Sequence, residues 1–156
     1  MSRVLLLGAD YYGTLAAARC YGRHGIDVVM ADETRSGRAL FSRHVREKLV
    51  HPRLGEPGAL VDWLVDYGER HPETLLYAPN DHLAWLFAAE KARLGRAFLM
   101  YQPDETAVLT LLDKKRLHDA CAAVGIDVPA TTSFFGAEAA ARSLAFPVLV
   151  KPRPSR

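Results

Sequence analysis

Short apolar segments alternate with helix-prone segments along most of this chain, and that alternation restricts the fold to a few architectures. Residues 4–7 and 26–31 are uniformly apolar, as in strands that are covered on both faces. Between them, residues 13–24 are rich in small residues and predict a helix, which Gly25 would end. A strand, a helix and a second strand within about 30 residues form one βαβ unit.

The same alternation continues beyond the first unit. An apolar stripe at helical spacing, made by Leu60, Trp63, Leu64 and Tyr67, predicts an amphipathic helix. The other expected elements are a short helix over 36–43, a strand near 48–50, a strand over 74–78, a helix capped by Asn80 or Asp81 and ending at 94–95, a strand over 97–101 and a helix from 103. This order predicts an α/β fold, with a mostly parallel sheet and helices on both faces.

Composition excludes several classes of protein. The 156 residues are 49% apolar and 24% charged with a net charge of +2, a balance that indicates a globular protein and gives no reason to expect nucleic acid or an anionic membrane as partner. No segment approaches the roughly 20 apolar residues of a membrane span, and the start is not a signal peptide, so we expect a cytoplasmic protein. Cys20 and Cys121 lie in apolar helical segments and are expected to be buried, reduced thiols. The scattered histidines predict no metal site made by this chain alone.

The loop from Gly8 to Gly13 follows the first expected strand and opens the first expected helix. A dinucleotide-binding fingerprint needs a glycine where this chain has Asp10, whose charge would repel a pyrophosphate. The loop is therefore either a tight structural turn or part of a small-substrate site. Asp10 and Tyr11 in this loop, and Asn80 and Asp81 after a later strand, are our candidates for substrate contact, since all four follow strand ends.

Two charged features have both a functional and a structural explanation. Asp32 lies 24 residues after Gly8, near the place where NAD-binding folds put a ribose-binding acid. Without the glycines, however, a solvated strand end is the expected role. The basic segment 35–53 is expected to be solvated surface, although it could add positive potential near a nucleotide or an acidic substrate.

The character of the chain changes after about residue 112. Residues 113–132 predict an amphipathic helix, with Leu117 and Cys121 on its apolar stripe, and a turn-rich linker. Within 133–156 we expect a strand at 134–135, a short helix over 137–144 and a strand over 146–152. One helix and two strands cannot bury a core of their own, so this part is expected to be the beginning of a larger domain.

Two segments of this second part, taken together, resemble the ATP-grasp superfamily. Residues 112–121, LDKKRLHDAC, followed by VGIDVPAT at 124–131, are similar to the signature in which Asp-Lys, a helix and G-I-x-x-P-x-T follow one another. Residues 146–152, FPVLVKP, are similar to the strand of that family that ends in Lys-Pro. SRH at 42–44, before a strand that ends in HP at 51–52, also resembles the N-terminal domain of the carboxylate–amine ligase branch.

This resemblance implies a Rossmann-like, pre-ATP-grasp domain over 1–112, a connecting helix and linker over 113–132, and the start of an α+β ATP-grasp domain over 133–156. The lysines that match Lys114 and Lys151 contact ATP phosphates in the family. Its members use ATP and Mg²⁺ to convert a small-molecule carboxylate into an acylphosphate, which an amine then attacks. A homodimer is possible.

In the family the metal ligands and most of the adenine pocket lie downstream of the residue that matches Lys151. The chain as given is therefore expected to be inactive, with no catalytic residue of its own. Two alternatives remain open: a Rossmann-like dinucleotide-binding module or oxidoreductase that uses Asp32, and a non-catalytic interaction domain that retains the fold.

Overall fold

The computed structural model describes residues 2–132, 138, 142, 144–145 and 147–153. The chain divides into two compact units, Met1–Val108 and Leu109–Arg156.

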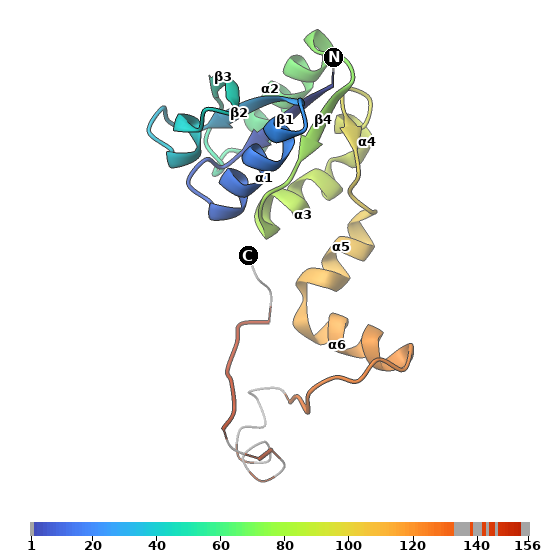
Figure 1. Ribbon diagram of the computed structural model, residues 1–156. Coiled ribbons are helices and arrows are strands. Elements are labelled where there is room, and N and C mark those ends of the chain that lie inside the picture. The colour runs from blue at the N-terminus through green and yellow to red at the C-terminus, as the bar shows by residue number, and fades with distance from the viewer. Residues whose placement is uncertain (1, 133–137, 139–141, 143, 146, 154–156) are drawn as a thin grey trace. The chain divides into compact units, whose positions relative to one another are not determined.

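The first unit is built on a five-stranded, wholly parallel sheet (Figure 1). Its strands are β1 (Arg3–Leu7), β2 (Asp27–Asp32), β3 (Val45–Val50), β4 (Thr74–Tyr77) and β5 (Leu99–Met100). They lie in the order β3-β2-β1-β4-β5, so β1 is central and pairs with both β2 and β4. Sequence analysis predicted this parallel α/β architecture, and the structure confirms it.

Helices cover both faces of the sheet because successive strand residues point to opposite sides. Leu5 and Leu7 of β1 pack in one core, which includes side chains of α2, α3 and α4. Val4 and Leu6 pack in the other core, against α1 and the short 3₁₀ helix η1. The helical bounds are α1 Tyr12–Arg23, η1 Arg38–Phe41, α2 Pro57–Arg70, α3 Asp81–Ala89, α4 Lys91–Leu94, α5 Glu105–Leu112 and α6 Lys114–Ala123.

Several elements of the first unit differ from their expected extents. The strand expected near 48–50 is β3, which begins already at Val45. The helix expected to run to residue 94 is interrupted at Glu90, which separates α3 from α4. The helix expected over 36–43 is the single 3₁₀ turn η1. The strand expected over 97–101 has only two residues, because β5 lies at the sheet edge and pairs with β4 only at Leu75–Leu99 and Leu76–Met100.

The prediction that both cysteines are buried is wrong. Cys20 is exposed and Cys121 is half-buried, and both are free thiols. In α1 the buried side chains are Thr14 and Ala18. Cys20 follows Ala18 by two residues, a rotation of about 200° around the helix, so it faces away from the core.

In the second unit, α6 has no buried side chain, so its expected apolar stripe is not covered by the described residues. The strand expected over 146–152 is also not formed at Val148–Pro152. A strand needs a neighbouring strand for its backbone hydrogen bonds, and the described part of this unit contains no other strand. Leu149 and Val150 are accordingly 78% and 76% exposed. The expected strand at 134–135, and residues 137, 139–141 and 143 of the expected helix over 137–144, lie outside the described residues. Of that expected helix, Glu138 and Arg142 are helical. Among the described residues, no helix is long and apolar enough to cross a membrane.

Candidate functional site

The sheet order defines one place in the first unit where loops diverge. From β1 the chain winds outward through β2 and β3, then returns to form β4 on the other side of β1. The pairing of Leu6 with Tyr77 brings the carboxyl ends of β1 and β4 to the same level. In open α/β sheets, ligands bind at such a topological switch point.

The loop after β1 is a tight turn held by its own hydrogen bonds. Gly8 has a φ of +71°, in the left-handed region that favours glycine. Its carbonyl accepts hydrogen bonds from the amide of Tyr11 (3.1 Å) and from the hydroxyl of Thr14 (2.7 Å), and the Thr14 side chain is fully buried. The loop is thus a tight turn, the first of its two predicted roles. Its role in substrate binding stays a prediction.

Asp10 is exposed and paired with a cation from another loop. Its carboxylate accepts a hydrogen bond from the amide of Arg38 (3.1 Å) and lies 3.5 Å from the Arg38 Nε. The Arg38 Nη2 also donates to the Asp10 carbonyl (3.3 Å). Sequence analysis assigned Arg38 to a solvated basic segment. It is solvated, but it also neutralises the one acid in the turn.

Asn80 caps α3, as expected from its residue type. Its Oδ1 accepts a hydrogen bond from the amide of Leu83 at 2.9 Å. A Cβ added to Gly8 would lie 3.7 Å from the Asn80 Nδ2, so the loops after β1 and β4 are in contact range of each other. Asp81, the first residue of α3, is exposed beside them.

Two exposed tyrosines, Tyr11 and Tyr12, lie at the carboxyl edge of the sheet, after β1. The rings of Tyr11 and Tyr12 are 4.6 Å apart between centroids, and the Tyr11 hydroxyl donates to that of Tyr12 at 3.4 Å. The pKa of Tyr11 is raised, first by this hydrogen bond and also by the negative charge of Asp81. Asp10, Tyr11, Asn80 and Asp81 are therefore gathered at one edge of the sheet. Tyr12 was not singled out, because one aromatic residue at a helix start carries no sequence signal.

A row of three further tyrosines lies beside the end of β4. The ring of Tyr77 contacts Tyr21 of α1 edge-on at 5.9 Å and lies 5.7 Å from the ring of Tyr101. Burial raises the pKa of both Tyr21 and Tyr101. Sequence reasoning missed this row because its members are 56 and 24 residues apart and meet only in the folded sheet.

Asp32, expected to be a solvated strand end, is half-buried and bound to backbone on both oxygens. Its Oδ2 accepts from the amide of Ala9 (3.1 Å) and its Oδ1 from the amide of Glu33 (2.8 Å). Gly37 packs so closely that an added Cβ would lie 2.3 Å from the Asp32 Oδ2. The carboxylate thus fastens the loop after β1 to the end of β2, which explains why it is not simply solvated.

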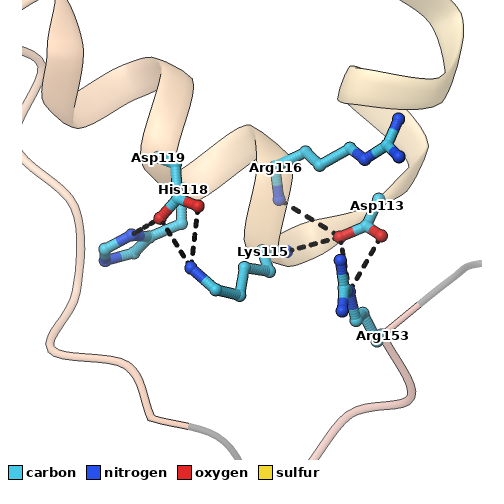
Figure 2. A network of polar contacts seen from close by, with 6 residues as sticks. All are labelled: Asp113, Lys115, Arg116, His118, Asp119 and Arg153. Atoms are coloured by element: carbon cyan, nitrogen blue, oxygen red, sulfur yellow. Dashed lines mark hydrogen bonds and ion pairs between the residues drawn. The ribbon is translucent and has the colours of Figure 1, made fainter.

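The second unit contains both lysines that the resemblance assigned to ATP. Lys114 is the first residue of α6, and Lys151 is exposed. A network of charged groups surrounds this helix start (Figure 2). Asp113 caps α6 by accepting from the amides of Lys115 (3.0 Å) and Arg116 (3.1 Å).

The same carboxylate binds a residue 40 positions away. The Arg153 Nε lies 2.9 Å and 2.8 Å from the two oxygens of Asp113. These contacts lower the pKa of Asp113 to about 2, with the Arg153 hydrogen bond as the largest cause. The Arg153 carbonyl in turn accepts from the amide of Lys114 at 3.1 Å. Sequence analysis noted Asp113 only as part of a motif. Its type and place before a helix are the cap signal that could have identified its role.

Among the described residues, no group of three or more His, Cys, Asp or Glu side chains could hold a metal ion.

These features define an α/β protein of Rossmann-like topology, with polar and aromatic side chains at the switch point of its sheet. Neither a protein-family model nor a curated protein matches the chain by sequence.

Among solved structures, the chain is similar to N5-carboxyaminoimidazole ribonucleotide synthetase from Thermotoga maritima, with a TM-score of 0.62 and 18% sequence identity. The match covers 99% of this chain and 39% of the synthetase chain. At this identity the likeness concerns the fold. That synthetase is an ATP-grasp enzyme, and the match is to its N-terminal part. The fold that the sequence motifs implied is thereby confirmed.

Proposed function

We propose that this chain is the N-terminal part of an ATP-dependent carboxylate–amine ligase of the ATP-grasp type. The observation that carries the proposal is the agreement in fold over 99% of the chain with the N-terminal part of an ATP-grasp enzyme. The sequence motifs around Lys114 and Lys151, which resemble those of the ATP-grasp family, also support it.

In this proposal Lys114 and Lys151 bind phosphate oxygens of ATP. A lysine ammonium is a compact point charge suited to phosphate, and Lys151 is exposed and so accessible to a nucleotide. Mg²⁺ would offset charge at the γ-phosphate. In the ATP-grasp family its ligands lie downstream of the residue that matches Lys151, and we propose the same place for them here. Because the chain spans 39% of the synthetase that it resembles, activity is proposed for the full ligase and not for this part alone.

The carboxyl edge of the sheet is the proposed place for the carboxylate or amine substrate. Asp10, Tyr11, Asn80 and Asp81 lie there together, at the switch point where β1 and β4 adjoin. Asn80 already caps α3 through its Oδ1, so its amide nitrogen is the group that would meet a substrate.

The alternative of a dinucleotide-binding module has less support. Such a module would use Asp32 to bind a ribose hydroxyl, but both oxygens of Asp32 accept hydrogen bonds from backbone amides. A ribose would have to share an acceptor that already holds the loop after β1.

The experiment is nucleotide binding and carboxylate-dependent ADP release by the full ligase and three lysine variants. Lys114→Ala and Lys151→Ala are each expected to weaken ATP binding about tenfold or more, the effect of losing one charge-assisted contact. Lys115→Ala is the matched control, because it removes an adjacent lysine of the same helix that is paired with Asp119. Equal affinities for all three variants would refute the assignment. Binding of NAD(H) without ATP would favour the dinucleotide module, and binding of neither would favour an interaction domain.

A further inference from the structure

The start of α6 leaves one backbone donor that its own cap does not satisfy. The first N–H groups of a helix have no partner within the helix. Asp113 accepts from the amides of Lys115 and Arg116, and its own amide donates to the Leu109 carbonyl at 3.0 Å. The amide of Lys114 remains, and it donates to the carbonyl of Arg153.

Arg153 therefore binds the helix start twice, once through its backbone and once through its side chain. The Arg153 Nε donates to both carboxylate oxygens of Asp113 in a three-centre hydrogen bond (Figure 2). The Arg153 carbonyl accepts from the amide of Lys114. This contact is charge-assisted, so it is stronger than a hydrogen bond between neutral groups. The Arg153 and Asp113 side chains are 59% and 21% exposed, so the acid is the more enclosed partner.

Anchoring Arg153 also constrains Lys151. The two are separated only by Pro152, whose ring fixes its own φ and holds the preceding residue in an extended conformation. Lys151 is thus connected to Arg153 by a stiff link of at most about 7 Å. Residues whose backbones are paired lie about 5 Å apart, so the Cα atoms of Lys114 and Lys151 are within about 12 Å of each other.

We propose that the contact between Asp113 and Arg153 is a positioning clamp that holds Lys114 and Lys151 close enough to bind the phosphates of one nucleotide. Asp113 and Arg153 are positioning residues, since neither needs to touch the nucleotide. The functional part of this inference rests on the proposed function, whereas the clamp itself is a property of the chain. The low pKa of Asp113 agrees with the clamp, because a carboxyl group with a low pKa stays charged and can bind Arg153.

The clamp can be tested without nucleotide by cross-linking and hydrogen exchange on the chain. Asp113→Asn is the main variant, because asparagine caps a helix as well as aspartate does but carries no charge for Arg153. A short amine-reactive cross-linker, with mass-spectrometric mapping, should join Lys114 to Lys151 in the wild type. We expect Asp113→Asn and Arg153→Gln each to lower that yield and to accelerate exchange of the Lys114 amide about fivefold.

Two further variants separate positioning from simple helix capping. Asp119→Asn removes the ion pair with Lys115 on the same helix and should change neither measurement. Arg153→Lys keeps the charge and should recover part of the cross-link yield. Unchanged yield and exchange in both Asp113→Asn and Arg153→Gln would overturn the clamp. Should Asp113→Asn lose helix by circular dichroism, the Arg153 variants decide the matter alone, because they leave the cap residue in place.

ATP affinity, measured on the full ligase with the same variants, tests the functional part. Weaker ATP binding in Asp113→Asn and Arg153→Gln, partly recovered in Arg153→Lys, supports positioning for phosphate binding. The proposed function would be refuted if Lys114→Ala and Lys151→Ala left the ATP affinity of the ligase unchanged. The clamp would still stand if the cross-link between the two lysines formed in the wild type. Normal ATP affinity after loss of the cross-link would refute the positioning role alone.

Discussion

Replacing Asp32 by alanine should destabilise the first unit, because this carboxylate joins the loop after β1 to the end of β2. The amides of Ala9 and Glu33 each donate to it, and hydrogen bonds to a charged group contribute about 1.5–3 kcal/mol each. Asp32 is only half-buried, so water can replace part of each bond. We therefore expect the free energy of unfolding to fall by about 2–3 kcal/mol and the melting temperature by about 10 °C.

Urea unfolding monitored by tryptophan fluorescence measures this loss, since both tryptophans, Trp63 and Trp85, pack against a core of the first unit. Asp66→Asn is the control: it removes an exposed ion pair with Arg70 one helical turn away and should cost about 0.5 kcal/mol or less. An Asp32→Ala variant that loses no more stability than Asp66→Asn would refute the fastening role and reopen Asp32 as a ligand-binding acid.

Replacing two glycines of α2 by alanine should change the stability of the first unit in opposite directions. Gly68→Ala would place a Cβ 2.8 Å from both the Cβ and the carbonyl oxygen of Ala97, and should lower the free energy of unfolding by about 1–3 kcal/mol. The Cβ of Gly58→Ala would meet nothing within 4 Å, and this variant should raise the free energy of unfolding by about 0.5 kcal/mol. Urea unfolding checks both, and shifts of the same sign would contradict the packing. For Asp113, whose folded pKa is about 2 against an ordinary 3.8, the carboxylate's contribution to stability is complete above pH 3.8 and is lost as the pH falls toward 2. A carboxyl titration by NMR should show this midpoint in the wild type and a higher one in Arg153→Gln, and an ordinary midpoint in the wild type would contradict the contact.

Local sequence patterns were sufficient to predict most of the fold. Apolar runs and helical stripes predicted all five strands and most of the helices between them, because a short apolar run and a 3.6-residue period both depend on residues close together in the sequence. Residue type predicted a cap at Asn80 or Asp81, and the structure assigns it to Asn80. The predictions were wrong where contacts between distant parts of the chain decide the structure. The length of β5 depends on its pairing with β4. The exposure of Cys20 depends on which side of α1 packs against the sheet.

The candidate site divides in the same way. Strand ends placed Asp10, Tyr11, Asn80 and Asp81 in one region, since parallel strands end at a common edge. The pairing of Asp10 with Arg38 was not predicted, because it joins residues 28 positions apart that have no shared pattern.

By itself, then, the sequence determined the element types, the parallel α/β architecture and the motifs that resemble ATP-grasp enzymes, all of which depend on residues close together in the chain. Only the tertiary structure decided that Asp32 fastens the loop after β1 and that Arg153 binds the start of α6. The physical reason is that a hydrogen bond or an ion pair requires a distance of about 3 Å and a defined direction. Residues 23 or 40 positions apart reach that geometry only after the chain has folded.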